Sequence, residues 1–317
     1  MSAPQLIASG QEGTLKDQVV GYFQRIKNGD MGALPAVVAL FALAVLFAGL
    51  SPYFLTKLNV ANLFVQAAEL TVLACALVFV LLLAEIDLSA GVTAGVGMGL
   101  FIILNQKMGL PWPVAVLGAL CVGLLVGSFI GFFVAKIGVP SFVVTLGLFL
   151  GFQGLQLIML GDGGLYRVDI PEILALMNSN MPDWAGWLMV VIMILVTLGL
   201  SLWDRARRSK AGLTSRPISL MIAKVVVIGG LSAILVAILN ENRSVSVLPI
   251  SGVPIVIPVV IGIIFIGTFV LDRTRFGRHL YAVGGNPEAA RRSGIKVASI
   301  RISAFVICST LAVVSGL

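Results

Sequence analysis

The sequence predicts an all-α fold, a polytopic bundle of transmembrane helices. Of its 317 residues, 59% are hydrophobic and only 11% are charged, whereas soluble domains carry about a quarter charged residues. The mean hydropathy is +1.07, and the apolar residues form runs long enough to cross a bilayer core of about 30 Å. A soluble domain of this size could not cover so much apolar surface, so lipid is expected to be its main solvent.

About nine apolar runs are predicted to span the membrane as helices, since each approaches the roughly 20 residues that a spanning helix needs. Spanning strands would be about half as long. The runs are residues 33–50, 63–84, 88–104, 111–135, 139–160, 184–203, 220–239, 253–271 and 302–317. Only Glu85, Ile86 and Asp87 separate the second run from the third, so a broken or re-entrant helix is an alternative there.

The basic residues predict the orientation of the chain. They gather in alternate loops, above all in residues 205–216 and 273–301, whereas the long loop 161–183 contains a single arginine and several carboxylates. Cytoplasmic loops of membrane proteins carry the excess of Lys and Arg. We therefore expect residues 1–30 to form a cytoplasmic N-terminal segment and residues 31–317 to form one transmembrane domain with a cytoplasmic loop at 272–301. The formal net charge of +7 then belongs to these loops and does not indicate nucleic-acid binding.

Glycines at four-residue spacing predict close helix packing inside three of the runs. Small residues on one helix face let backbones approach in lipid, where no hydrophobic force drives helices together. The glycines are Gly91, Gly95 and Gly99 in the third run, Gly123, Gly127 and Gly131 in the fourth, and Gly147 and Gly151 in the fifth. They predict a tightly packed bundle and do not identify a function.

A short helix is predicted inside the cytoplasmic loop. Asn286 is a good N-cap, Pro287 suits the first helical position, and Glu288 lies at the positive end of the helix dipole. Gly294 can end the helix in a left-handed conformation. The whole segment is Gly284, Gly285, Asn286, Pro287, Glu288, Ala289, Ala290, Arg291, Arg292, Ser293 and Gly294. From these residues alone, it is either a turn on lipid headgroups, with both arginines at phosphates, or a docking helix for a cytoplasmic partner.

Three polar residues are candidates for the translocation path or for structural roles, because polar groups in lipid are expensive. Asp87 could serve a proton relay, although we favour a capping role at the third helix, beside Ser89. Gln153 and Gln156 lie three residues apart on one helical face and could meet a sugar in a pore or bond to a neighbouring helix. Lys224, near the inner end of the seventh run, is expected to reach the membrane surface.

The sequence offers little material for catalysis or for a cofactor. It contains no GxxxxGK[ST] phosphate loop, so ATP binding by that route is excluded. His279 is the single histidine, and Cys75, Cys121 and Cys308 lie inside apolar runs without a CxxC pair. No catalytic residues, metal site or cofactor are therefore predicted. An intramembrane enzyme would need a nucleophile–base or metal constellation that these residues do not supply.

Three segments form recognisable motifs: SPYFLT at 51–56 followed by NVANL at 59–63, EIDLSAG at 85–91, and TRFGR at 274–278 followed by AVGGNPEAARRSGI at 282–295. Together they resemble the permease subunit of bacterial ABC sugar importers of the ribose/xylose type. The third segment is the most specific, since residue types, spacing and predicted side of the membrane all match. The additional pair of runs around the basic loop 204–217 is more similar to the xylose-type members.

This resemblance implies a transport subunit of the bacterial inner membrane. The helix within Gly284–Gly294 would dock on a separate cytoplasmic ATPase, and the partners would include a periplasmic sugar-binding protein and a second permease copy. The substrate would be a sugar, a pentose such as xylose. Family members continue through further spans after the run that begins at Ile302, so the resemblance also implies a chain that is incomplete at its C-terminus. The alternative is an ion-coupled secondary transporter of a small polar solute, which would need an inverted repeat and carboxylates in mid-membrane.

Overall fold

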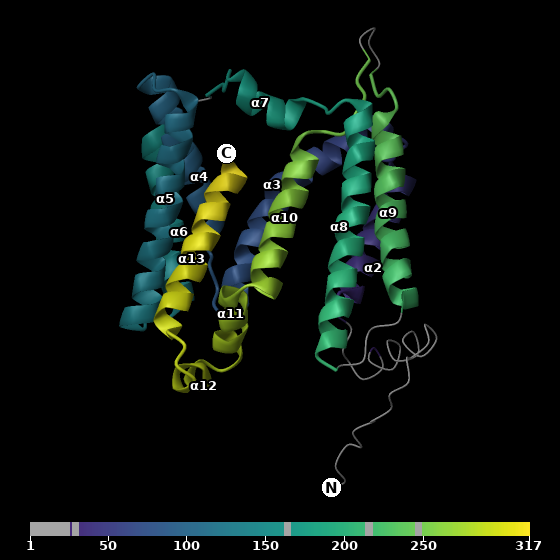
Figure 1. Ribbon diagram of the computed structural model, residues 1–317. Helices are drawn as coiled ribbons and strands as arrows, with labels where there is room; N and C mark the ends of the chain where they lie inside the picture. The colour runs from purple at the N-terminus through teal and green to yellow at the C-terminus, as the bar shows by residue number, and fades with distance from the viewer. Residues whose placement is uncertain (1–25, 27–31, 162–165, 213–217, 245–248) are drawn as a thin grey trace. The chain divides into compact units, whose positions relative to one another are not determined.

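The computed structural model describes residue 26 and residues 32–161, 166–212, 218–244 and 249–317, and this part of the chain is almost entirely helical (Figure 1). Apart from Ile26, the predicted N-terminal segment 1–30 lies outside the described residues. The elements are α2 Leu34–Leu50, α3 Lys57–Leu81, α4 Ala90–Ile102, the π-helix Ile103–Lys107, α5 Trp112–Phe132, the π-helix Phe133–Ile137, α6 Ser141–Leu160, α7 Pro171–Asn178, α8 Asp183–Lys210, α9 Ile218–Asn240, α10 Val256–Arg273, α11 Arg275–Gly285, α12 Pro287–Arg292 and α13 Val297–Gly316.

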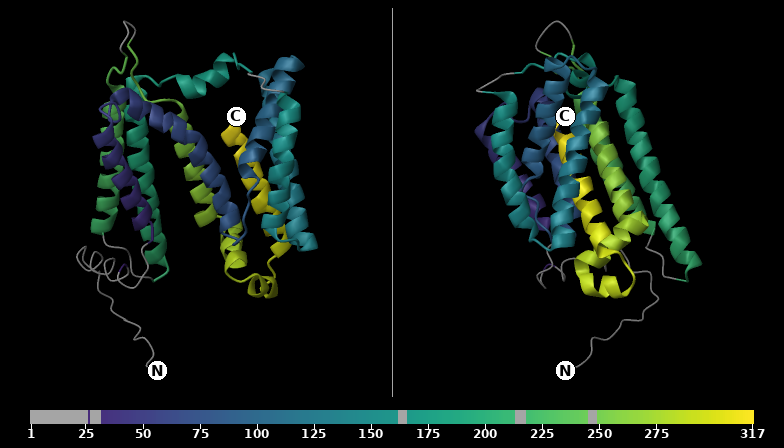
Figure 2. Two further views of the ribbon diagram at one scale, coloured as in Figure 1. Left: turned by 180° about the vertical axis from the view of Figure 1, so that it is seen from behind. Right: turned by 90° about the vertical axis from the view of Figure 1, so that its left-hand side faces the viewer.

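The chain folds as two compact units. One comprises the described parts of Met1–Asn62 and Asn180–Val253, with α2, α8 and α9. The other comprises Leu63–Ser179 and Pro254–Leu317, with most of α3, then α4 to α7 and α10 to α13. In the first unit α8 packs along α9, and in the second α13 packs along α5 and α4, as the two views in Figure 2 also show.

The apolar runs predicted to span the membrane form helices, but among the described residues fewer than nine helices are long and apolar enough to do so. Within the described residues, seven helices are long and apolar enough to cross a membrane, and α2, with 17 residues, is shorter. The predicted run 88–104 is helical from Ala90, as α4 of 13 residues followed directly by the π-helix that ends at Lys107. It is not among the seven helices, and the polar residues Asn105, Gln106 and Lys107 follow the predicted run directly. The alternative of a broken helix describes this boundary better, since α3 ends at Leu81 and Ala84 has a left-handed φ of 57°.

The glycine spacing of α5 is explained by its contact with α13. A Cβ atom on Gly127 would lie 2.5 Å from the carbonyl oxygen of Phe305, and one on Gly123 would lie 2.6 Å from the Cα of Thr310. The predicted close approach is therefore confirmed for α5. A Cβ atom added to Gly147 or Gly151 of α6, by contrast, would meet no heavy atom within 4 Å. That face makes no close helix contact within the described chain.

A buried arginine organises the loop that follows α9 in the first unit. Arg243 is 6% exposed, and its guanidinium donates to the carbonyl oxygens of Leu239 and Gly252 and to Oδ1 of Asn180, the last two at 3.0 Å. Burial lowers the pKa of Arg243 from its ordinary value, but a guanidinium remains charged in proteins. One side chain thus joins the end of α9 to Gly252 and to Asn180, which precedes α8.

Replacing Arg243 with alanine is expected to destabilise this unit by about 3 kcal/mol, because two buried carbonyls and an amide oxygen lose a charged donor. Thermal unfolding of the detergent-solubilised protein measures the loss. Arg167→Ala is the matched control, since the side chain of Arg167 is 87% exposed and, among the described residues, forms an ion pair with the exposed Asp169. Such a surface pair contributes at most about 1 kcal/mol. Equal melting of the two variants would contradict the role given to Arg243.

Candidate functional site

The short helix predicted within 284–294 forms where the sequence predicts it. The Oδ1 atom of Asn286 accepts a hydrogen bond of 2.9 Å from the backbone N–H of Ala289, and Pro287 is the first helical residue. The helix α12 ends at Arg292, and Gly294 follows with φ 83°. The predicted N-cap, first residue and left-handed end are all confirmed. A helix of six residues is unstable alone, so its surroundings must hold it.

The helix α11, which precedes α12, is not among the elements predicted from the sequence. Its N-cap is Thr274, whose hydroxyl accepts from the N–H of Gly277 at 3.2 Å. Its buried side includes Leu280 and Val283. A threonine cap followed by apolar residues at helical spacing is a readable signal. This signal was missed because it lies inside a loop whose overall hydropathy indicates only a polar connection between two spans.

An apolar cluster fixes α11 and α12 to the spanning helices. Leu280, Val283 and Ala290 are buried together with Phe79 of α3, with Leu83 just after α3, and with Val297 and Ala304 of α13. The contact extends to the backbone that follows α3, because a Cβ atom on Gly284 would lie 1.8 Å from the carbonyl oxygen of Leu82. The pair α11–α12 is therefore seated on the end of α3 and the beginning of α13, as Figure 1 shows for α12 and α13. Movement of this pair must displace one or both of those helices.

The opposite side of α12 is open. Ala289 is exposed, whereas its neighbour Ala290 is 4% exposed and belongs to the cluster. Glu288 pairs with Arg292 at 3.2 Å and with Arg291 at 3.8 Å, and all three side chains are more than half exposed. Exposed pairs of this kind contribute at most about 1 kcal/mol. Breaking these ion pairs costs little free energy, so the side chains of this face are available to a partner surface.

The break between α3 and α4 is held by polar contacts around Asp87. Its Oδ1 atom accepts from the N–H of Ser89 at 2.8 Å and from the hydroxyl of Ser89 at 2.7 Å. The thiol of Cys308, on α13, lies 3.7 Å from Oδ2. Asp87 is 7% exposed. Asp87 thus binds Ser89, the N-cap residue of α4, whereas the side chain of Ser89 itself forms no cap hydrogen bond. Both the capping role and the transport role of Asp87 stay predictions.

Two further contacts connect the break to its neighbours. The hydroxyl of Ser141 accepts from the N–H of Ile86 at 3.1 Å, so the beginning of α6 covers the irregular segment. Arg301 of α13 lies 3.4 Å from the carboxylate of Glu85, and both side chains are largely buried at 27% and 14% exposure. The break is thereby joined to the first turns of α13, next to the cluster that seats α11 and α12.

The structure separates the two candidate glutamines. The side-chain amide of Gln156 donates to the carbonyl of Val92 at 2.7 Å and lies against Gly95. Gln153 is exposed. Gln156 therefore shows the second of its two predicted contacts, a hydrogen bond to a neighbouring helix and not a contact with a sugar in a pore. Gln153 and Gln156 do not converge on one site with Asp87.

A cavity of about 410 Å³ lies in the second unit, between α3, α5, α7, α10 and α13. Its lining is mainly apolar, with Trp112, Ile173 and Val260, and its polar members include Glu69 and Ser315. The hydroxyl of Ser315 donates to the backbone carbonyl of Glu69 at 2.9 Å. None of the predicted polar candidates lines this cavity. This cavity could not be predicted from the sequence, because the residues that line it come from five helices that are distant from one another in the chain.

Known proteins similar to this chain are transport permeases. The family described as "Branched-chain amino acid transport system / permease component" matches residues 59–270 and 173–317. A xylose transport system permease protein of Escherichia coli K12 is 32% identical over 302 residues, covering 94% of this chain and 74% of the relative.

More distant relatives include an autoinducer 2 import system permease protein of Enterobacter sp. strain 638, 28% identical over 92% of this chain and 64% of the relative. A ribose import permease protein of Escherichia coli K12 is 26% identical over 89% of this chain and 67% of the relative. No solved structure matches the chain.

Proposed function

Because the chain belongs to the family of branched-chain amino acid transport system permease components, we propose that it is the membrane-spanning subunit of an ATP-driven importer of a pentose such as xylose. The observation that carries this proposal is the 32% identity to a xylose permease over 94% of the chain. The relatives are permease proteins for xylose, ribose and autoinducer 2. They give no support to the alternative of an ion-coupled secondary transporter. The chain acts as a transport subunit and leaves ATP hydrolysis to a partner chain.

The exposed face of α12 is the proposed docking surface for the ATPase. Its exposed residues Glu288, Ala289, Arg291 and Arg292 meet the partner, while Ala290 and α11 hold the helix on the membrane domain. A displacement of α12 reaches α3 through Phe79 and through Leu83, which follows the helix. It reaches α13 through Val297 and Ala304. Tightly packed clusters transmit such displacements because they have little free volume. ATP-driven closure of the partner would change the access of the transport path in this way.

The other proposed partners follow from the orientation. With the N-terminus in the cytoplasm, α7 and its loop face outward and meet a periplasmic sugar-binding protein. A second copy of the permease completes the transport path, and the open face of α6 around Gly147 and Gly151 can accept a helix of that copy. Membrane lipid covers the remaining apolar surface.

Replacing Ala289 with aspartate is expected to abolish sugar uptake and recovery of the ATPase, because a charged side chain is introduced at the centre of the docking face. The permease with an affinity tag is purified in mild detergent, and co-purifying chains with a GxxxxGK[ST] motif are identified by mass spectrometry. Uptake of labelled xylose is measured in the same cells. The amount of permease in the membrane should remain as in the unmodified protein, since Ala289 is exposed.

Two variants calibrate this experiment. Ala211→Asp makes the same change at an exposed alanine after α8 and should leave ATPase recovery and uptake unaltered. Ala290→Asp places a carboxylate in the buried cluster and should lower the amount of folded permease itself, because a buried unpaired charge is costly. Full ATPase recovery with Ala289→Asp would contradict the docking role of α12.

A further inference from the structure

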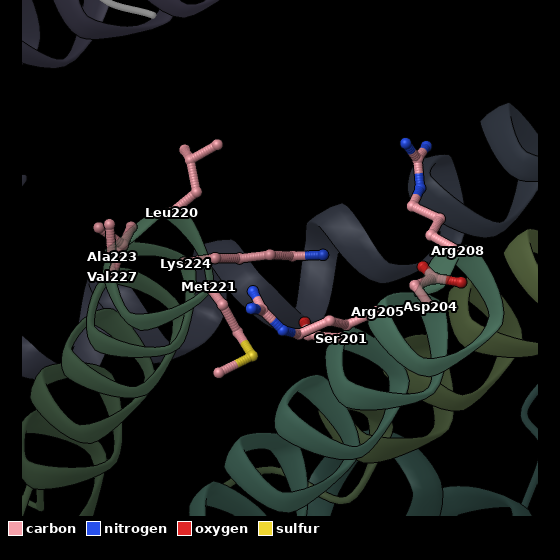
Figure 3. Close-up of a pocket in the computed structure, with 9 residues that line it drawn as sticks. All are labelled: Ser201, Asp204, Arg205, Arg208, Leu220, Met221, Ala223, Lys224 and Val227. Carbon is pink, nitrogen blue, oxygen red and sulfur yellow. The ribbon is translucent and has the colours of Figure 1, made fainter. Parts of the chain in front are cut away.

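Two cavities of the described chain differ in how their charged groups are occupied. The cavity between α8 and α9 in the first unit, of about 550 Å³, is lined by several charged side chains (Figure 3), and Asp204 and Arg205 among them already interact with other groups. The cavity of about 410 Å³ in the second unit has Glu69 as the only charged residue among the described residues that line it. Ser315 bonds to the backbone carbonyl of Glu69, and no described residue forms a hydrogen bond or ion pair with its carboxylate.

Glu69 lies in the middle of a spanning helix. The helix α3 has 25 residues and is long and apolar enough to cross a membrane, and Glu69 is at the midpoint of Lys57–Leu81. An ionisable residue at this depth is costly, faces a bundle interior or a water-filled space, and typically marks the path of a solute. The side chain of Glu69 is exposed and lines the cavity, so its carboxylate is accessible to a molecule inside.

The rest of the lining suits the carbon skeleton of a small solute. Trp112, at the beginning of α5, supplies an indole ring, and Ile173 of α7 and Val260 of α10 supply aliphatic surface. Binding sites for small molecules typically combine such apolar walls with a few polar groups that fix the orientation of the ligand. A sugar ring has both parts, because it presents C–H groups on its faces and hydroxyl groups around its edge. The C–H groups can lie against the indole while hydroxyl groups donate to the carboxylate.

We propose that this cavity is the sugar-binding site of the transport path, with Glu69 as the acceptor for sugar hydroxyl groups and Trp112 as the platform for the sugar ring. The inference rests on the proposed function, which supplies the pentose. A carboxylate forms stronger hydrogen bonds than a neutral acceptor, but the apolar walls add few further polar contacts, so binding is weak. Weak binding suits a transport path, because the solute has to leave again. A divalent cation fits less well, because it needs several oxygen ligands and the lining supplies one carboxylate.

The test is saturation-transfer difference NMR of the purified full chain in detergent, titrated with xylose in the absence of partner chains. Glu69→Gln should weaken xylose binding about tenfold, because a neutral amide replaces the charged acceptor. Trp112→Ala should also weaken binding, whereas Trp112→Phe should retain most of it because an aromatic ring remains. Among monodeoxy xyloses, the one that lacks the hydroxyl bonded to Glu69 should bind the unmodified chain more weakly and should be insensitive to Glu69→Gln.

The matched control is Glu241→Gln, because Glu241 is exposed, belongs to the first unit and does not line the cavity. It should leave the affinity for xylose unchanged within about twofold. Equal affinity of the unmodified chain and Glu69→Gln, or equal weakening by Glu69→Gln and Glu241→Gln, would overturn the proposal. Glu69 is exposed, so Glu69→Gln is expected to fold.

Two further outcomes separate this proposal from the proposed function. An unmodified chain that binds no xylose, although cells take up xylose and the ATPase is recovered, would overturn the sugar site and leave the importer intact. Bound xylose without uptake and without a recovered ATPase would support the site and contradict the ATP-driven importer. Choline that displaces xylose from the unmodified chain, and loses its affinity in Glu69→Gln, would assign the cavity to an organic cation and overturn the sugar assignment.

Discussion

A Gly127→Leu variant is expected to lose the packing of α5 on α13 and to be destabilised by more than about 3 kcal/mol, at the upper end of overpacking effects. The first side-chain carbon alone would lie 2.5 Å from the carbonyl oxygen of Phe305 and 2.5 Å from the Cα of Val306. Both obstacles are backbone atoms inside a helix, which cannot turn aside as a flexible side chain can. In lipid, helix pairing depends on such close contact, so separation of the two helices removes its main source of stability.

Thermal unfolding in detergent, followed by size-exclusion chromatography, measures the effect on the solubilised protein. Gly127→Ala should show a smaller loss in the same direction, since it adds one carbon. Gly199→Leu on α8 is the control, because no heavy atom lies within 4 Å of the position where its Cβ would be. That control should be neutral or slightly stabilising, since leucine favours helix over glycine by roughly 1 kcal/mol. If Gly127→Leu melts at the temperature of Gly199→Leu, the close packing of α5 and α13 is wrong.

The second large effect is expected from Gly284→Ala, which should abolish uptake while most of the protein remains in the membrane. The new Cβ atom would lie 1.8 Å from the carbonyl oxygen of Leu82, so α11 has to move away from the end of α3. That movement opens the cluster around Leu280 and Val283 and breaks the path from α12 to the spanning helices. We expect a local loss of about 3 kcal/mol.

Labelling of an added cysteine separates this structural effect from the proposed function. Leu280 is completely buried, so a thiol in Leu280→Cys should resist labelling, and should become reactive when Gly284→Ala is added. Gly285→Ala supplies the control, because it adds the same atom one residue later where no heavy atom lies within 4 Å. Lost uptake with an unreactive thiol would mean that α11 remains seated and that Gly284 acts in another way. Unaltered uptake together with a reactive thiol would contradict the transmission of force through this cluster.

Several features of the fold are readable from the sequence because they depend on neighbouring residues. Long apolar runs predict spanning helices, since lipid leaves the backbone no other way to satisfy its hydrogen bonds. The boundaries of α12 are equally local, because Asn286, Pro287 and Gly294 act within one turn of the helix that they delimit. The family is also readable, since its most specific motif is this same continuous segment.

Other features were decided by tertiary structure, because they depend on contacts between residues far apart in the chain. Hydropathy could not locate the end of α3, since the residues on both sides of the break are apolar, and the contacts of Ile86 with Ser141 and of Glu85 with Arg301 support it. Glycine spacing was the same in α5 and α6, yet only α5 meets a backbone, that of α13. Regular glycine spacing shows that a helix has a face of small residues. Only the fold determines whether another helix packs against that face.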